Sequence, residues 1–180
     1  MIYVCLAEGF EETEAITPID LLRRAGAQVT VVGVTGKTVT GSHGIPVVAD
    51  KEIGEIDGSD VELVVLPGGM PGTLNLENSE GVQRLIDTAA RRGALLGAIC
   101  AAPSILGHKG LLNGKTAVCF PGFEKDLTGA VPGTEETVRD GNIITSRGAG
   151  SAVSFGLKLV EALYGEKQAE ELGKTIQWRR

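Results

Sequence analysis

Short apolar runs that alternate with helical patterns constrain the fold of this chain more than any other feature of its sequence. The runs have the length and the aliphatic content of buried strands, and they occupy residues 1–7, 29–34, 61–66 and 94–99. Apolar residues recur with the helical period in residues 16–25, 79–92 and 151–163. Strands that alternate with helices predict a layered α/β sandwich with a mainly parallel sheet.

Weaker patterns predict shorter elements. These are a small excursion at residues 45–48, short helices at 102–108 and 166–172, a strand at 116–119, and a hairpin at a sheet edge formed by 137–140 and 142–145. The strand at residues 61–66 is followed by Pro67-Gly68-Gly69. Backbone N–H groups at such a strand end lie at the carboxyl edge of the sheet, where open α/β folds bind ligands.

Composition limits the class of protein. A length of 180 residues fits one domain, spanning residues 1–180, and 26 glycines with 42% hydrophobic residues are typical of a globular protein with many tight turns. The formal charge of −6 predicts no nucleic-acid partner, because phosphate binding requires a patch of lysine and arginine. No apolar run approaches the roughly 18 residues that span a bilayer, and residues 1–7 lack the basic start of a signal peptide. We therefore expect no membrane association and no secretory leader.

The three cysteines, Cys5, Cys100 and Cys119, share no C-x-x-C spacing, and an odd number is a poor disulfide framework. We expect reduced thiols and a cytoplasmic location. Cys100 lies where an apolar run meets small residues, in Gly97-Ala98-Ile99-Cys100-Ala101-Ala102-Pro103, which predicts a sharp turn from strand to helix. The N–H groups and dipole of a following helix favour a thiolate there. By position alone, an inert buried thiol remains the alternative.

Other motifs do not predict a cofactor or a metal. Residues 110–116 resemble a phosphate loop but have three residues between the glycines where four are required, and residues 68–72 do not fit G-x-G-x-x-G. His43 and His108 have no cysteine or second histidine near them in the sequence, so we expect no zinc site. His108 follows Cys100 by eight residues, at the end of a helix that points away, and is a poor candidate for a catalytic base.

Four motifs, in this order and spacing, resemble the ThiJ/PfpI (DJ-one) superfamily, and in particular its branch with the Parkinson-disease protein deglycase and the bacterial YajL-like proteins. They are Glu8-Gly9-Phe10-Glu11-Glu12-Thr13-Glu14, Leu66-Pro67-Gly68-Gly69, Ala98-Ile99-Cys100-Ala101-Ala102-Pro103 and Thr145-Ser146-Arg147-Gly148-Ala149-Gly150. The resemblance extends from Met1 to about Tyr164. It implies a flavodoxin-like three-layer α/β/α sandwich with a cysteine nucleophile elbow, and a homodimer.

The resemblance also assigns roles within a site. Cys100 matches the reactive cysteine and Glu14 the glutamate that contacts its sulfur. A carboxyl group donates a hydrogen bond to sulfur only when it is protonated, so this arrangement implies a raised pKa for Glu14. Gly69 and Ala101 match the positions whose backbone N–H groups form an oxyanion pocket.

Gly68, Cys119 and Phe120 are expected to line the pocket. Phe120, or Cys119 if the alignment slips by one, stands where human-type members have a histidine. Ala101 stands where PfpI-like peptidases have theirs, so the peptidase triad is missing. Both departures weaken a prediction of amidase or peptidase activity, which stays a minor alternative.

Three further positions match the family. Arg24 matches an arginine near the dimer contact of some relatives, and His43 replaces a second one, which weakens the prediction of an anion site between subunits. Arg147 is expected to hold the loop before the last long helix.

Two functions are consistent with these expectations. The first is a cysteine-dependent, cofactor-independent glyoxalase or deglycase that acts on α-oxoaldehydes or their early glycation adducts. The second is a non-enzymatic oxidative-stress sensor or redox-regulated holdase chaperone, in which Cys100 is oxidised to sulfenic and then sulfinic acid while Glu14 stabilises the product.

Overall fold

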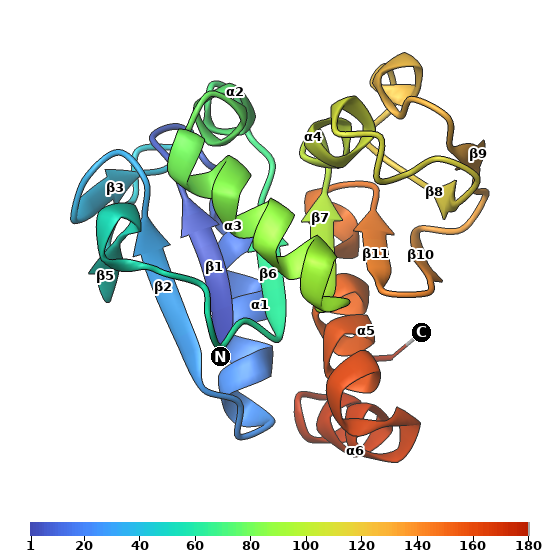
Figure 1. Cartoon of the computed structure of the whole chain (residues 1–180). Coiled ribbons are helices and arrows are strands. Elements are labelled where there is room, and N and C mark those ends of the chain that lie inside the picture. Colours follow the sequence, from blue (N-terminus) through green and yellow to red (C-terminus); the bar gives the residue numbers. More distant parts are fainter. Residues whose placement is uncertain (180) are drawn as a thin grey trace.

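A seven-stranded sheet forms the centre of the molecule in the computed structural model, which describes residues 1–179 (Figure 1). In spatial order its strands are β10 (Thr137–Asp140), β11 (Ile143–Ser146), β7 (Leu95–Ile99), β6 (Leu63–Leu66), β1 (Ile2–Leu6), β2 (Val29–Gly33) and β5 (Lys51–Glu52). All neighbouring strands run parallel except β10, which is antiparallel to β11. The predicted mainly parallel sheet is therefore confirmed.

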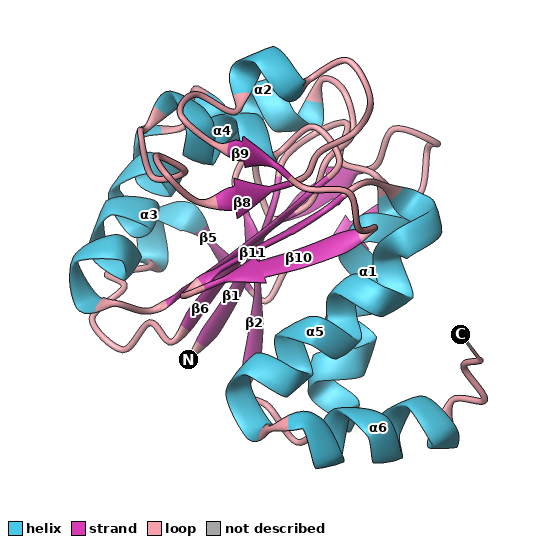
Figure 2. Ribbon diagram, turned by 90° about the vertical axis from the view of Figure 1, so that its right-hand side faces the viewer, coloured by secondary structure: helices cyan, strands magenta, loops and turns pink. Residues whose placement is uncertain are grey.

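Helices cover both faces of this sheet (Figure 2). One side carries α1 (Glu12–Arg24) and α5 (Ala152–Tyr164), with α6 (Glu166–Thr175) packed against α5. The other side carries α2 (Gly72–Glu77), α3 (Glu80–Arg92) and α4 (Pro103–His108). The arrangement confirms the expected three-layer sandwich. Within residues 1–179, no helix combines the length and the apolar character needed to cross a membrane.

Two small sheets lie outside the main one. The predicted excursion is an antiparallel pair of β3 (Thr38–Thr40) and β4 (Pro46–Val48), and β8 (Thr116–Ala117) pairs in parallel with β9 (Val131–Pro132). The strand predicted at 116–119 therefore ends early and does not join the main sheet. It ends because the N–H of Val118 donates to the Thr145 hydroxyl oxygen at 3.0 Å instead of continuing a ladder.

The predicted edge hairpin is confirmed: β10 and β11 pair antiparallel around Gly141-Asn142, and β10 forms one edge of the main sheet. Its second strand, β11, is buried along its length and also pairs in parallel with β7. Neither α2 nor β5 was predicted. Three short 3₁₀ turns complete the described structure: η1 (Ile53–Glu55), η2 (Glu124–Asp126) and η3 (Ala149–Ser151).

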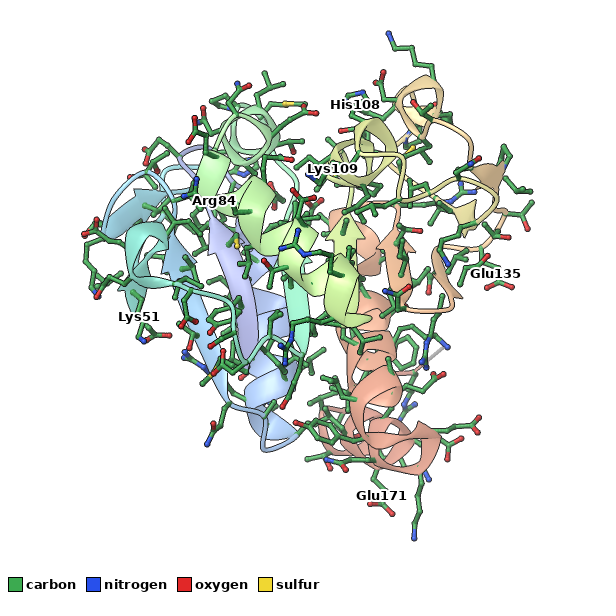
Figure 3. The ribbon with its side chains drawn as sticks, viewed as in Figure 1. Lys51, Arg84, His108, Lys109, Glu135 and Glu171 are labelled. Carbon is green, nitrogen blue, oxygen red and sulfur yellow. The ribbon has the colours of Figure 1, made fainter. Side chains whose placement is uncertain are left out.

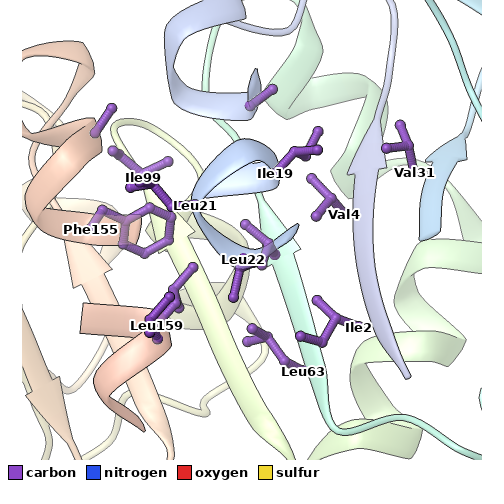
Figure 4. Close-up of a cluster of buried hydrophobic side chains, with 14 of the residues drawn as sticks. Ile2, Val4, Ile19, Leu21, Leu22, Val31, Leu63, Ile99, Phe155 and Leu159 are labelled. Carbon is purple, nitrogen blue, oxygen red and sulfur yellow. The ribbon is translucent and has the colours of Figure 1, made fainter. Parts of the chain in front are cut away.

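An aliphatic core fixes the strand that leads to Cys100 (Figure 4). Ile99 is fully buried in the cluster between the sheet and helices α1 and α5, which also contains Phe155 and Leu159. Gly97 lets α5 approach closely, because a Cβ at that position would lie 2.9 Å from Cδ2 of Leu159. The last residues of β7 are thus held rigidly, and so is the turn that follows.

Candidate active site

Cys100 occupies a sharp turn between β7 and α4. Its φ angle is +65°, in the left-handed region that residues with a Cβ rarely adopt, at a cost of about 1–2 kcal/mol. Both of its backbone groups are bonded: its N–H donates to the Ser146 carbonyl at 2.9 Å, and its carbonyl accepts from the Phe120 N–H at 2.7 Å. Helix α4 begins three residues later, at Pro103. The predicted turn from strand to helix is confirmed, and Cys100 is half-buried, whereas Cys5 and Cys119 are buried.

Glu14 approaches Cys100 from the first turn of α1. Its side chain is almost fully buried, with 1% of the residue exposed, on the face of α1 that packs on the sheet. Oε2 accepts a hydrogen bond from the N–H of Gly68 at 2.9 Å, and the carboxyl group is also hydrogen-bonded by the N–H of Ala149. The carboxyl and the thiol of Cys100 are hydrogen-bonded to each other. The structure therefore brings together the two residues that the sequence singled out.

Two glycines after β6 make this approach possible. A Cβ on Gly68 would lie 2.6 Å from both Cβ of Cys100 and Oε2 of Glu14, closer than real Cβ atoms come. Gly69 has a φ of +90°, and a Cβ there would meet the backbone nitrogen of Glu11 at 2.4 Å. Gly68 and Gly69 are thus required by close backbone approach to the site, as well as by the turn.

Burial dominates the electrostatics of the pair. It raises the pKa of Glu14 to about 7, and the neighbouring charge of Glu11 acts in the same direction, while hydrogen bonds from Cys100 and Gly68 partly oppose the rise. Burial also raises the pKa of the Cys100 thiol, and the negative charge of Glu14 raises it further. This last contribution disappears when Glu14 binds a proton, because the carboxyl is then neutral. The neutral carboxyl instead donates a hydrogen bond to sulfur.

Gly69 and Ala101 provide backbone donors at the sulfur. Their N–H groups are hydrogen-bonded to Cys100 and lower the pKa of its thiol, which is the effect expected from the sequence. In the structure, burial and the charge of Glu14 outweigh them. The same two donors are available to a negative oxygen that forms on an atom bonded to Sγ.

Phe120 lies beside the Cys100–Glu14 pair, whereas Cys119 lines a separate cavity. A Cβ built on Gly148 would lie 3.3 Å from Cδ2 of Phe120 and 3.9 Å from Oε1 of Glu14, so the ring is close to the reacting pair. Cys119 instead borders a separate small cavity with Arg147, and burial raises its pKa to about 11. Of the two alternatives for the position of the family's pocket histidine, the geometry therefore favours Phe120.

The histidines are engaged elsewhere. His108, the last residue of α4, lies at the surface and contacts Oε1 of Glu77 at 2.5 Å (Figure 3). His43 lies in the loop between β3 and β4, where its Nδ1 is 3.1 Å from Oε2 of Glu12. Neither is hydrogen-bonded to Cys100. As expected from the sequence, neither histidine is positioned to act as a base for Cys100.

The two arginines named from the sequence have local partners. Arg24 pairs with Asp20 one turn earlier in α1, at 2.7 Å. Arg147 donates to the carbonyl oxygens of Glu135 and Thr134 at 3.1 and 3.2 Å, which ties the loop before α5 to the segment before β10. The geometry of Arg147 matches the structural role expected for it.

Sequence reasoning missed one cluster. Glu11, Glu12 and His43 bring possible metal-ligand atoms within 4.8 Å of one another, although they are about 30 residues apart in the chain. The buried carboxylate of Glu12 already accepts the N–H groups of His43 at 2.8 Å and Ile45 at 3.3 Å. These bonds explain its burial without an ion, and no local pattern marks such a contact in the sequence.

Comparisons with known proteins agree with this geometry. A model described as the DJ-1/PfpI family matches residues 1–162. The chain is 39% identical over 181 residues to Protein DJ-1 homolog B of Arabidopsis thaliana, covering 99% of this chain and 41% of that protein. It spans less than half the length of both Arabidopsis relatives, homologs A and B.

Two further relatives are similar over almost their whole length. The protein named glutathione-independent glyoxalase DJR-1.2 of Caenorhabditis elegans is 31% identical over 170 residues, covering 94% of this chain and 91% of that protein. The solved structure of Toxoplasma gondii DJ-1, described as oxidized, superposes with a TM-score of 0.96 at 36% identity, covering 99% of this chain and 98% of that one.

Proposed function

This chain belongs to the DJ-1/PfpI family, and from that premise we propose that it is a cysteine-dependent, cofactor-independent glyoxalase of α-oxoaldehydes, with deglycase action on early glycation adducts. One observation carries the proposal: a half-buried thiol on a strained turn shares a hydrogen bond with a buried carboxyl whose pKa is about 7. A general acid–base works best with a pKa near the working pH. The C. elegans relative, named a glutathione-independent glyoxalase, supports the same chemistry.

Hemithioacetal formation is the first step. Sγ of Cys100 bonds to the aldehyde carbon, and the proton shared by Cys100 and Glu14 passes to the aldehyde oxygen. The N–H groups of Gly69 and Ala101 stabilise the negative charge on that oxygen before it is protonated. Glu14 is left as a carboxylate, ready to act as a base.

An internal proton transfer follows. Glu14 removes the hydrogen on the former aldehyde carbon as a proton, and the electron pair left behind forms an enediolate with the neighbouring carbonyl carbon. The hydroxyl proton on the first carbon passes to the oxygen of the second, and Glu14 returns its proton to that second carbon, which gives a 2-hydroxyacyl thioester on Cys100. Water then cleaves the thioester to the 2-hydroxy acid and restores the thiol. The first carbon is oxidised and the second reduced, so the reaction needs no external oxidant or reductant.

Lactate formation from methylglyoxal tests this proposal. We expect purified protein to release lactate, the Cys100→Ser variant to release none above background, and Glu14→Ala to lose roughly 100-fold or more in rate. His108→Gln should keep the wild-type rate, because His108 contacts Glu77 and not the site. Equal lactate from wild type, Cys100→Ser and Glu14→Ala would contradict the proposal.

Redox sensing by Cys100 is the second candidate. A buried carboxyl with a pKa of about 7 can be protonated and donate a hydrogen bond to an oxidised sulfur, and a structural relative is described as oxidized. Peroxide converts the thiolate to sulfenic acid and water, and a second peroxide gives sulfinic acid. Mass spectrometry after graded peroxide should find Cys100 oxidised before Cys5 and Cys119. If Cys100 is not oxidised first, this candidate fails, whatever the lactate assay shows.

A further inference from the structure

Phe120 exposes an aromatic ring next to the reacting pair. The residue is 47% exposed, although phenylalanine is among the residues most often buried. Its backbone N–H donates to the carbonyl of Cys100 at 2.7 Å, which fixes the residue to the turn that carries the thiol. The side chain is therefore held at the site while much of its surface stays free.

Gly148 lies between this ring and Glu14, where a methyl group would be crowded against the ring. A Cβ there would lie 3.3 Å from Cδ2 of Phe120 and 3.9 Å from Oε1 of Glu14. The φ of Gly148 is 166°, an extended conformation that any residue adopts, so its backbone conformation does not require glycine. What glycine provides at this position is the absence of a side chain.

Resting on the proposed function, we infer that Phe120 is a specificity-determining residue whose exposed ring contacts the substituent of an α-oxoaldehyde bound at Cys100. The aldehyde end reacts at Cys100, and the carbonyl oxygens require the polar groups of Glu14, Gly69 and Ala101. A phenyl or alkyl substituent then lies against the ring, where it gains apolar contact and, for phenyl, aromatic stacking. Glyoxal carries only hydrogen at that position and gains nothing. The substrate class is therefore aryl- and alkyl-substituted oxoaldehydes.

Selectivity in turnover tests the inference. We expect the ratio of kcat/KM for phenylglyoxal to that for glyoxal to fall about tenfold in Phe120→Ala, with a smaller fall for methylglyoxal. Gly148→Ala should lower the same ratio, because its methyl group, 3.3 Å from Cδ2 of Phe120, would displace the ring. Phe123→Leu is the matched control, since Phe123 is an aromatic residue of the same loop that packs on the core, and it should keep the wild-type ratio.

Alkylation of Cys100 supplies a readout that does not need turnover. Sγ displaces iodide from either iodoacetamide or iodoacetanilide, which differ in a phenyl ring, and peptide mass spectrometry follows the Cys100 peptide. Each alkylation rate is divided by the rate of the same reagent with glutathione. The resulting ratio of the iodoacetanilide rate to the iodoacetamide rate should be several-fold higher for wild type than for Phe120→Ala.

The two readouts separate the inference from the function on which it rests. An anilide preference that depends on Phe120, without turnover of any oxoaldehyde, would support the apolar contact and refute the glyoxalase. Turnover with ratios that are unchanged in both Phe120→Ala and Gly148→Ala would refute the inference and leave the glyoxalase standing. Absence of both turnover and anilide preference would refute both.

Discussion

Glu14 and Cys100 share a hydrogen bond. Because the pKa of Glu14 is about 7, its carboxyl gains or loses a proton near neutral pH. With Glu14 ionised, its charge opposes a thiolate, whereas with Glu14 protonated the carboxyl donates to sulfur and the N–H groups of Gly69 and Ala101 favour the charged form. The thiol and the acid therefore act as one unit. The turn at Cys100 could be predicted from its local sequence, but the pairing of Cys100 with a buried Glu14 was predicted only from the family resemblance, because a glutamate in the first turn of a helix is ordinarily solvated.

Substitution of Glu14 by glutamine should change how stability depends on pH. Burial raises the pKa of Glu14 from the ordinary 4.5 to about 7, so the folded protein binds this proton more tightly than the unfolded chain does. Stability that is present below pH 4.5 is lost as the pH rises through 7. Glutamine imitates the neutral acid, so Glu14→Gln should equal wild type near pH 4.5 and exceed it by about 3 kcal/mol at pH 8. Urea unfolding at both pH values measures this. A variant less stable than wild type at pH 8 would contradict it.

Gly68→Ala should damage both stability and the site. The added methyl group would lie 2.6 Å from Cβ of Cys100 and from Oε2 of Glu14, both of which are held by backbone bonds. We expect a loss of about 1–3 kcal/mol in the free energy of unfolding, together with slower lactate formation. Gly54→Ala is the control, because nothing lies within 4 Å of its Cβ position, and it should unfold like wild type. Equal stability of Gly68→Ala and Gly54→Ala would show that the contact relaxes freely.

At the scale of elements, the first turn of α1 joins three separate parts of the chain. Glu14 contacts the end of β6 and the turn after β7, and Glu12 binds the loop between β3 and β4. Gly41 in that loop allows the contact, since a Cβ there would overlap the Glu12 carboxyl at 2.3 Å. The helix was predicted from its apolar period and the contact of Glu14 with Cys100 from the family resemblance. The contacts of Glu12 were not predicted, because they join residues more than 30 positions apart.

Glu12→Ala should release the loop between β3 and β4 from α1. Two backbone N–H groups, of His43 and Ile45, would lose their acceptor, at a cost of about 1–3 kcal/mol. Burial opposes ionisation of Glu12, but its hydrogen bonds together outweigh burial and lower its pKa. Its stabilising contribution is therefore present above the pKa of the unfolded chain and is lost as the pH falls through the lowered value. The deficit of the variant, measured by urea unfolding, should therefore shrink in acid.

Glu80→Ala is the matched comparison for that loss. Glu80 also lies in the first turn of a helix, but its side chain is 92% exposed and its partner is an exposed Arg84. Its removal should change the free energy of unfolding by less than about 0.5 kcal/mol. A deficit of Glu12→Ala no larger than that of Glu80→Ala would mean that the contacts of Glu12 contribute nothing.

At the scale of the whole molecule, the site is assembled where four segments meet at the carboxyl edge of a parallel sheet. The alternation of strands and helices was enough to predict this architecture. The site was predicted to lie at the ends of β6 and β7. The pairing of β11 with β7 could not be predicted, because the periodicity of a short apolar strand does not tell an edge position from an interior one. That pairing holds the turn, since Ser146 of β11 accepts the N–H of Cys100.

Exposed apolar side chains lie beside Glu11, Glu12 and His43, and they suggest how two copies of the chain could associate. Ile16, one turn after Glu12 on α1, is 41% exposed, and Ile45, whose N–H binds Glu12, is 55% exposed. The family resemblance places His43 near a subunit contact, and we propose that these residues form part of a homodimer interface. Exposed isoleucines around a satisfied polar cluster suit such a contact.

Sedimentation velocity at micromolar concentration tests the dimer. Wild type should sediment at twice the monomer mass, and Ile16→Glu should shift it toward the monomer, because a charge buried without a partner opposes association. Val131→Glu places the same charge on β9, in the small sheet apart from α1, where Val131 is 53% exposed, and it should leave the mass unchanged. A wild-type protein that is monomeric, or an Ile16→Glu variant as dimeric as Val131→Glu, would refute this surface as the interface. Lactate formation measured on the same samples would then show whether association affects Glu14, which lies two residues from Ile16 on the buried side of α1.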